Sequence, residues 1–138
     1  MTESFVIPYP KSEAERKQWN RLYGFNAYYA GKHWTRRSED ANMWHSLVAY
    51  EMERQQVRKT PMERAVILRF YWNDRLDLSN HAVMAKMIED AMKGRVIRDD
   101  SRKWVCGIEH YFHDEPYIRV VISEIQNTTN FISQEEEA

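Results

Sequence analysis

Residues 65–72 read AVILRFYW, and the rest of the fold can be worked out from this stretch. Successive side chains of an extended chain point to opposite faces. Val66, Leu68, Phe70 and Trp72 therefore share one face, and the alternate residues share the other. The sequence predicts a strand here.

The residues after this strand predict a crossover and two further strands. A helix is expected over about residues 79–93, with Ala85, Ile88 and Met92 facing inward and Gly94 ending it. Strands are expected over about 103–112 and 116–125. A helix between two strands permits parallel pairing. The loop 113–116 has the length and composition of a hairpin, so we expect the last two strands to pair antiparallel.

The residues before the strand predict a short first strand and two helices. Residues 5–7 are extended and apolar, and prolines follow them. Ser12 and Glu15 have capping-box spacing, so a helix is expected from there to about Leu22, with Gly24 as its stop. Residues 26–34 are expected to be a loop. The longer helix that follows has Thr35 or Ser38 as its cap and an apolar face of Ala41, Trp44, Val48 and Met52.

Together these elements predict one α+β domain over residues 1–125, with an acidic, flexible tail over 126–138. Its sheet is expected to be mixed, with about four strands and helices mainly on one face. No apolar run approaches the roughly 18 residues of a membrane span. No signal peptide is visible, and the single cysteine, Cys106, suits a cytoplasmic setting.

The overall charge does not favour a nucleic-acid partner. The formal net charge is −1, although it becomes +2 without the three glutamates Glu135, Glu136 and Glu137. Local patches matter more than this sum for contacts with phosphates.

Acidic residues at both ends of the predicted helix 79–93 suggest a metal site. Asp77 precedes the helix, Asp90 lies on it, and Asp99 and Asp100 follow it. Carboxylates are the ligands that hard divalent metals prefer, and such metals serve phosphodiester hydrolysis. Lys86 lies between them, where it can stabilise charge on a phosphoryl group.

Each of these residues also has an interpretation without a metal. Ser79 or Asn80 can cap the helix, Lys86 and Asp90 can form a surface ion pair, and residues 99–101 can form a turn. Cys106, His110 and His113 do not make a zinc site, because their spacing fits no standard ligand pair.

Two segments carry a resemblance to a known family. The first reads Asp77-x-x-Asn80, Lys86-x-x-x-Asp90-Ala-Met, Gly94-x-Val-Ile-x-Asp99-Asp100-Ser101. The second reads Asn26-Ala-Tyr-Tyr-Ala-Gly31-Lys-His-Trp34-x-x-Arg37. Both resemble the RusA family of Holliday-junction resolvases, its phage-encoded branches in particular, and the likeness covers about residues 5–125.

The resemblance implies a RusA-like fold and a homodimeric, Mg²⁺- or Mn²⁺-dependent endonuclease that cuts DNA four-way junctions in recombination and repair. It places metal ligands at Asp77 and Asp100, with Asp99 beside them, and the catalytic lysine at Lys86. The second aspartate of the family falls on Ser79, and three more residues separate that position from the lysine here. Asp90, Asp99 or Glu89 can supply the missing ligand.

Aromatic and basic residues predict a DNA-binding surface. Rings can stack on unpaired bases, and basic side chains can neutralise phosphates. The candidates are Tyr28, Lys32, His33, Arg36, Arg37, Asn80 and His81. The alternative for this segment is that Tyr29 and Trp34 pack in the core while the basic residues are solvated.

Two alternative functions remain open from the sequence. One is a dimeric junction-binding protein whose catalysis is impaired by Ser79. The other is a small interaction protein with no affinity for DNA, which the near-neutral charge permits.

Overall fold

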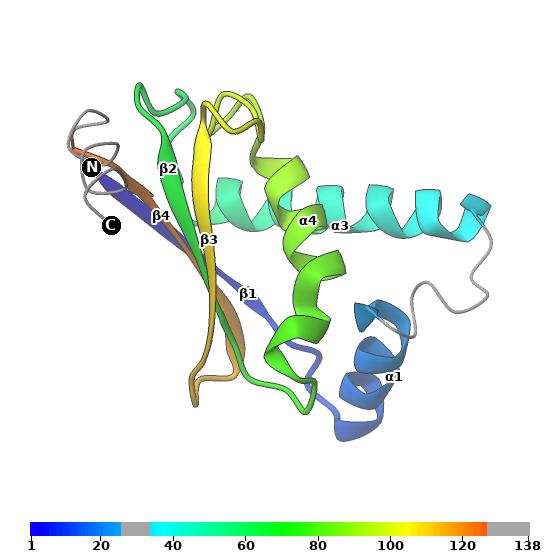
Figure 1. Cartoon of the computed structure of the whole chain (residues 1–138). Coiled ribbons are helices and arrows are strands. Elements are labelled where there is room, and N and C mark those ends of the chain that lie inside the picture. The colour runs from blue at the N-terminus through cyan, green and yellow to red at the C-terminus, as the bar shows by residue number, and fades with distance from the viewer. Residues whose placement is uncertain (26–33, 127–138) are drawn as a thin grey trace.

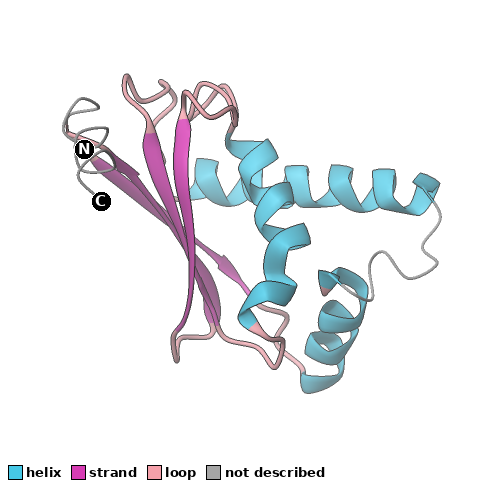
Figure 2. Ribbon diagram, viewed as in Figure 1, coloured by secondary structure: helices cyan, strands magenta, loops and turns pink. Residues whose placement is uncertain are grey.

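The structure, a computed structural model, describes residues 1–25 and 34–126. A four-stranded sheet forms one layer, and helices cover one of its faces (Figures 1 and 2). The elements in chain order are β1 (Thr2–Pro8), α1 (Glu13–Tyr23), α3 (Trp34–Arg54), β2 (Val66–Trp72), the 3₁₀ helix η1 (Leu78–His81), α4 (Ala82–Met92), β3 (Val105–Phe112) and β4 (Tyr117–Glu124). The predicted α+β class, with helices on one face, is confirmed.

The sheet is mixed, with the strand order β1-β4-β2-β3. β2 pairs in parallel with β3 and antiparallel with β4, and β4 pairs antiparallel with β1. The parallel crossover from β2 through α4 to β3 is therefore confirmed.

β3 and β4 are not neighbours, so the prediction that the last two strands pair with each other is wrong. β2 lies between them, and loop 113–116 crosses its end. The backbone N–H of His113 donates to the Trp72 carbonyl at 3.0 Å, and the Asn73 side-chain amide donates to the Glu115 carbonyl at 2.9 Å. In this central position, both edges of the apolar β2 strand have backbone partners, β3 on one side and β4 on the other.

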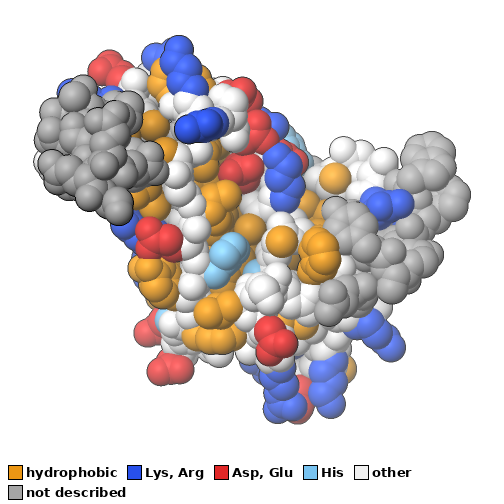
Figure 3. Space-filling model, viewed as in Figure 1, with side chains coloured by type: hydrophobic (Ala, Val, Ile, Leu, Met, Phe, Trp, Pro, Cys, Tyr) orange, Lys and Arg blue, Asp and Glu red, His pale blue; other side chains and the backbone are white. Residues whose placement is uncertain are grey.

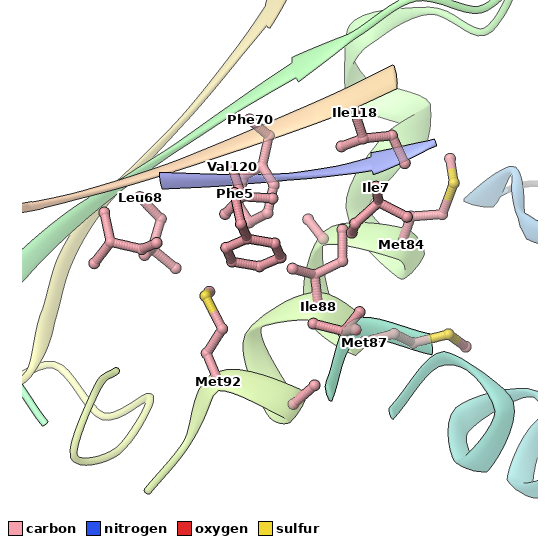
Figure 4. Close-up of a cluster of buried hydrophobic side chains, with 14 of the residues drawn as sticks. Phe5, Ile7, Leu68, Phe70, Met84, Met87, Ile88, Met92, Ile118 and Val120 are labelled. Atoms are coloured by element: carbon pink, nitrogen blue, oxygen red, sulfur yellow. The ribbon is translucent and has the colours of Figure 1, made fainter. Parts of the chain in front are cut away.

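The core lies between the sheet and helices α3 and α4. Leu68, Phe70 and Trp72 of β2 have no exposed surface, which confirms the predicted inner face of this strand. In Figure 4, Ile88 and Met92 of α4 point toward this face of the sheet. The predicted inward side of α4 is confirmed, because Ile88 and Met92 are 0% exposed.

Helix ends agree with the sequence in one helix and differ in two. The Ser12 hydroxyl accepts the Glu15 N–H at 3.1 Å and Gly24 is the C-cap, so the bounds of α1 are confirmed. α3 already begins at Trp34, so neither Thr35 nor Ser38 caps it. The expected start of α4 at Ser79 is a 3₁₀ turn, and the α-helix begins at Ala82.

The predicted loop over 26–34 and the predicted tail over 126–138 fall almost entirely outside the described residues. Within residues 1–25 and 34–126, no helix combines the length and the apolar character needed to cross a bilayer.

The C-terminus of α3 offers a test of backbone strain. Gln56 has φ 57°, and the N–H groups of Gln56 and Val57 donate to the carbonyls of Glu53 at 3.2 Å and Met52 at 2.9 Å. This is a Schellman cap, in which glycine is the preferred residue. Gln56→Gly is expected to raise the free energy of unfolding by about 0.5–1 kcal/mol in urea titrations, because the left-handed strain exceeds the backbone entropy of glycine.

Gly94 is the matched control, because its φ is 80° and an added Cβ would meet nothing within 4 Å. Gly94→Ala should therefore lower the free energy of unfolding by about 1 kcal/mol through the backbone alone. Equal stability of Gln56→Gly and the wild type would show that Gln56 carries no strain.

Candidate metal centre

Helix α4 and its C-cap residue, Lys93, place several charged side chains on one side. Lys86, Glu89, Asp90 and Lys93 are spaced by three, four and seven residues, which brings them to one face of a helix. The opposite face of α4 is held by the core, where Met84 and Ile88 are fully buried. The packing of α4 against the sheet therefore fixes which way the charged face points.

Asp100 reaches the same face from the loop that follows α4. Gly94, with φ 80°, reverses the chain, and its N–H donates to the Ile97 carbonyl at 2.8 Å. Val96 and Ile97 are buried at 0% and 1% exposure, and they anchor the loop. The residues that follow are thereby directed back along the helix, which brings the Asp100 carboxylate to Lys86.

The five side chains of Lys86, Glu89, Asp90, Lys93 and Asp100 form what we call the carboxylate–lysine cluster. The Lys86 Nζ lies 3.5 Å from Glu89 Oε1 and 3.1 Å from Asp90 Oδ1, and it donates to Asp100 Oδ2. The Lys93 Nζ lies 3.1 Å from the same Asp90 oxygen and 3.0 Å from the same Asp100 oxygen. Two ammonium groups thus bridge three carboxylates.

The cluster shifts the pKa values of its members. Hydrogen bonds from Lys86 and Lys93 hold the pKa of Asp100 well below its usual range. The hydrogen bond with Asp100 raises the pKa of Lys86, and that with Asp100 also raises the pKa of Lys93. Burial raises the pKa of Glu89. At neutral pH, Lys86 is therefore a fixed cation, suited to stabilising negative charge and unsuited to accepting a proton.

The carboxylates of the cluster can hold a divalent cation. One oxygen from each of Glu89, Asp90 and Asp100 lies within 4.8 Å of the others. Oxygens bound to one hard cation at about 2.0–2.6 Å are separated by no more than about 5 Å. Their separations therefore fit one shared divalent cation. The Lys86 ammonium lies where these oxygens converge, so it competes with a cation for them.

The structure brings together only part of the predicted acidic set. Asp90 and Asp100 meet at Lys86, and Glu89 joins them. Asp77 and Asp99 are exposed, and neither belongs to the converging group found within the described residues. This corrects the expectation that Asp77 and Asp100 meet in one metal set. Asp77 precedes η1 at one end of α4, whereas Asp100 follows the other end, and a helix of this length spans about 16 Å (Figure 1).

The alternative prediction that Ser79 or Asn80 caps the helix over 79–93 is also wrong. Asp77 is the N-cap of η1 and His81 that of α4, and neither side chain makes a capping hydrogen bond. Ser79 is exposed inside η1, so neither Ser79 nor Asn80 caps an α-helix.

The prediction that His81 contacts DNA is wrong, because its side chain has no exposed surface. Its Nε2 lies 2.9 Å from both carboxylate oxygens of Asp74, and its Nδ1 lies 3.0 Å from the Leu78 carbonyl. Both ring nitrogens are therefore held by oxygen atoms of the protein. Trp72 stacks on the His81 ring at 4.3 Å between ring centroids. His81 is a buried structural residue that fixes the start of α4.

The other predicted DNA-binding residues have mixed positions. Tyr28, Lys32 and His33 lie outside the described residues. Arg36 is exposed on α3, while Arg37 and Asn80 are partly buried. Contact of these residues with DNA stays a prediction.

Sequence reasoning missed Lys93 and His110. Lys93 is seven residues after Lys86, so extending the helical spacing by one more turn would have found it. The sequence spacing presents His110 only as a poor zinc ligand, yet the side chain lies across a groove from Lys86. No local sequence pattern could have predicted the position of His110, because the pairing of β3 with β2 brings this side chain opposite Lys86.

Comparisons with known proteins add no relative: no protein-family model matches this chain, and no curated protein matches it.

Proposed function

We propose that this protein is a metal-dependent endodeoxyribonuclease that acts on DNA four-way junctions. The observation that carries the proposal is the convergence of three carboxylates within 4.8 Å beside a lysine with a raised pKa. Such a set suits phosphodiester hydrolysis assisted by a divalent cation. The resemblance to the RusA resolvases supports the junction as substrate and a homodimer as the active form.

The residues of the cluster take separate roles in this proposal. Glu89, Asp90 and Asp100 would hold the Mg²⁺ or Mn²⁺ ion. The chemistry that such an ion supplies when bound is the activation of water and the polarisation of a phosphoryl oxygen. Lys86, with 56% of its side chain exposed, has room to turn from the carboxylates toward a phosphate and to stabilise its developing charge.

The test is cleavage of a synthetic four-way junction with linear duplex as the control substrate. Wild-type protein with Mg²⁺ or Mn²⁺ should introduce paired nicks in the junction, leave the linear duplex intact, and lose activity in a chelator. Sedimentation of the protein should give twice the chain mass. Failure to cut under both metals would reject the nuclease.

A metal-binding prediction follows from the position of the Lys86 ammonium. Lys86→Ala is expected to raise the affinity for Mg²⁺ on the order of tenfold in calorimetry, because it removes a cation that competes for the same oxygens. Lys103→Ala is the control, because Lys103 is exposed and outside the cluster. Unchanged affinity in Lys86→Ala would show that Mg²⁺ binds elsewhere.

A second candidate is a junction-binding protein without catalysis. Two observations favour it. The ammonium groups of Lys86 and Lys93 already neutralise most of the charge of the three carboxylates. Asp77 lies outside the converging carboxylates. This candidate predicts salt-sensitive binding to the junction with no cutting and no measurable affinity for metal. Ser79→Asp should then leave metal binding unchanged, because Ser79 lies in η1 at the same end of α4 as Asp77.

A further inference from the structure

A groove of about 220 Å³ runs between α4 and the edge strand β3. Its lining residues are Ala82, Ala85, Lys86, Glu89, Ile108 and His110. The two alanines keep the helix side of the groove open, and the charged members Lys86 and Glu89 belong to the carboxylate–lysine cluster. Figure 3 shows a histidine in a hollow among hydrophobic side chains on this side of the molecule. The groove therefore joins the candidate metal centre to the surface of β3.

The ring of His110 is held in one orientation and one tautomer. The Trp72 indole N–H donates to His110 Nδ1 at 3.0 Å. Indole nitrogen is a donor only, so Nδ1 must offer a lone pair and the proton of the neutral ring resides on Nε2. Phe70 stacks beside the ring, with centroids 5.5 Å apart and planes 18° apart. The parallel register that places Phe70 opposite His110 thus fixes the ring.

The remaining nitrogen of His110 is a neutral donor with no hydrogen-bond partner within residues 1–25 and 34–126. Burial, followed by the charge of His81, lowers the pKa of His110, so the ring stays uncharged at neutral pH. Glu89 does not attract it into an ion pair, because the Glu89 carboxylate lies 3.5 Å from the Lys86 ammonium. The groove therefore combines the Lys86 ammonium, the oriented neutral N–H of His110 and apolar walls.

We propose that this groove binds the phosphodiester backbone of the substrate, with the His110 Nε2–H donating a hydrogen bond to a non-bridging phosphate oxygen. This assignment rests on the proposed nuclease function and adds a substrate-contacting residue to it. Lys86 supplies the positive charge that the phosphate requires, and Ile108 with the alanines accommodates the sugar. Because stacking already holds the His110 ring in place, this neutral donor needs little reorientation as charge develops on the phosphate.

The first test replaces the ring while keeping its stacking. His110→Phe should lower kcat/KM for the four-way junction by about a hundredfold with little change in junction affinity, because a preorganised donor is lost. His110→Gln restores a side-chain donor and should recover part of the loss. His45→Phe, an exposed histidine on α3, is the control and should cut as the wild type does. Full activity of His110→Phe would overturn the proposal.

A second test does not depend on cleavage. ¹⁵N NMR of the histidine rings should show His110 with a bare Nδ1 and a protonated Nε2 near neutral pH. Adding a thymidine trinucleotide in chelator should shift the His110 Nε2 resonance and leave His45 unchanged. Trp72→Phe removes the donor to Nδ1, so it should allow both tautomers.

The two tests separate the two proposals. A wild type that does not cut, together with a trinucleotide-induced shift at His110, rejects the nuclease and keeps the phosphodiester groove. Cutting by the wild type without that shift rejects the groove and keeps the nuclease. A protonated Nδ1 in the free protein would also overturn the role of His110, because the ring would then present no N–H to the groove.

Discussion

Asp100→Asn is expected to lower the rate of junction cleavage by about a thousandfold or more, with junction binding retained. Asp100, like Asp90, touches both Lys86 and Lys93, and among the three converging carboxylates it alone comes from outside α4. Its amide analogue keeps the size of the side chain but offers one neutral oxygen to a cation. Single-turnover cleavage and binding in chelator measure the two effects separately.

Asp99→Asn is the matched control for this prediction. Asp99 is the exposed neighbour of Asp100 and does not belong to the converging carboxylates. The same change of charge one residue away should alter cleavage no more than about twofold, as a screened surface charge does. If Asp99→Asn abolished cleavage and Asp100→Asn did not, the assignment of the metal set would be wrong.

Asp74→Ala is expected to lower the free energy of unfolding by about 3–5 kcal/mol, because it leaves the buried His81 ring without its carboxylate partner. His81 is 0% exposed, and the Asp74 side chain is only 4% exposed. The change also removes the acceptor of the Tyr9 hydroxyl at 3.3 Å. Urea titration followed by tryptophan fluorescence gives the free energy directly.

Asp114→Ala serves as the comparison, because this aspartate is exposed in the loop before β4 and should change stability by less than about 0.5 kcal/mol. The double variant Asp74→Leu/His81→Leu should lose less stability than Asp74→Ala and His81→Leu together, because removing both partners leaves neither of them buried and unpaired. A loss below about 1 kcal/mol in Asp74→Ala would mean that the contact between Asp74 and His81 contributes little to the stability of the fold.

Much of the secondary structure was predictable because local rules decide it. The alternation of Leu68, Phe70 and Trp72 is a property of any strand with one buried face. Ser12 and Gly24 bound α1 through backbone contacts made within a few residues. The parallel pairing of β2 with β3 followed from the intervening helix, because a crossover of that kind has one usual outcome.

The candidate site was predictable only in part, for a related reason. Lys86 and Asp90 meet because they are four residues apart on a helix, which is a local relation. Glu89 and Lys93 follow from the same spacing. The expected pairing of Asp77 with Asp100 joined residues on opposite sides of a rigid helix, and the rise of that helix keeps its two ends apart.

The sequence by itself determined where strands and helices form and which face of α4 is charged, because these depend on side-chain periodicity over one or two turns. The tertiary structure alone decided that β2 separates β3 from β4, that His81 is buried against Asp74, and that His110 faces Lys86 across a groove. Each of these features depends on which elements occupy the sheet edges and the core, and those elements are far apart in the sequence. The packing of the whole fold decides these positions, so no local sequence pattern predicts them.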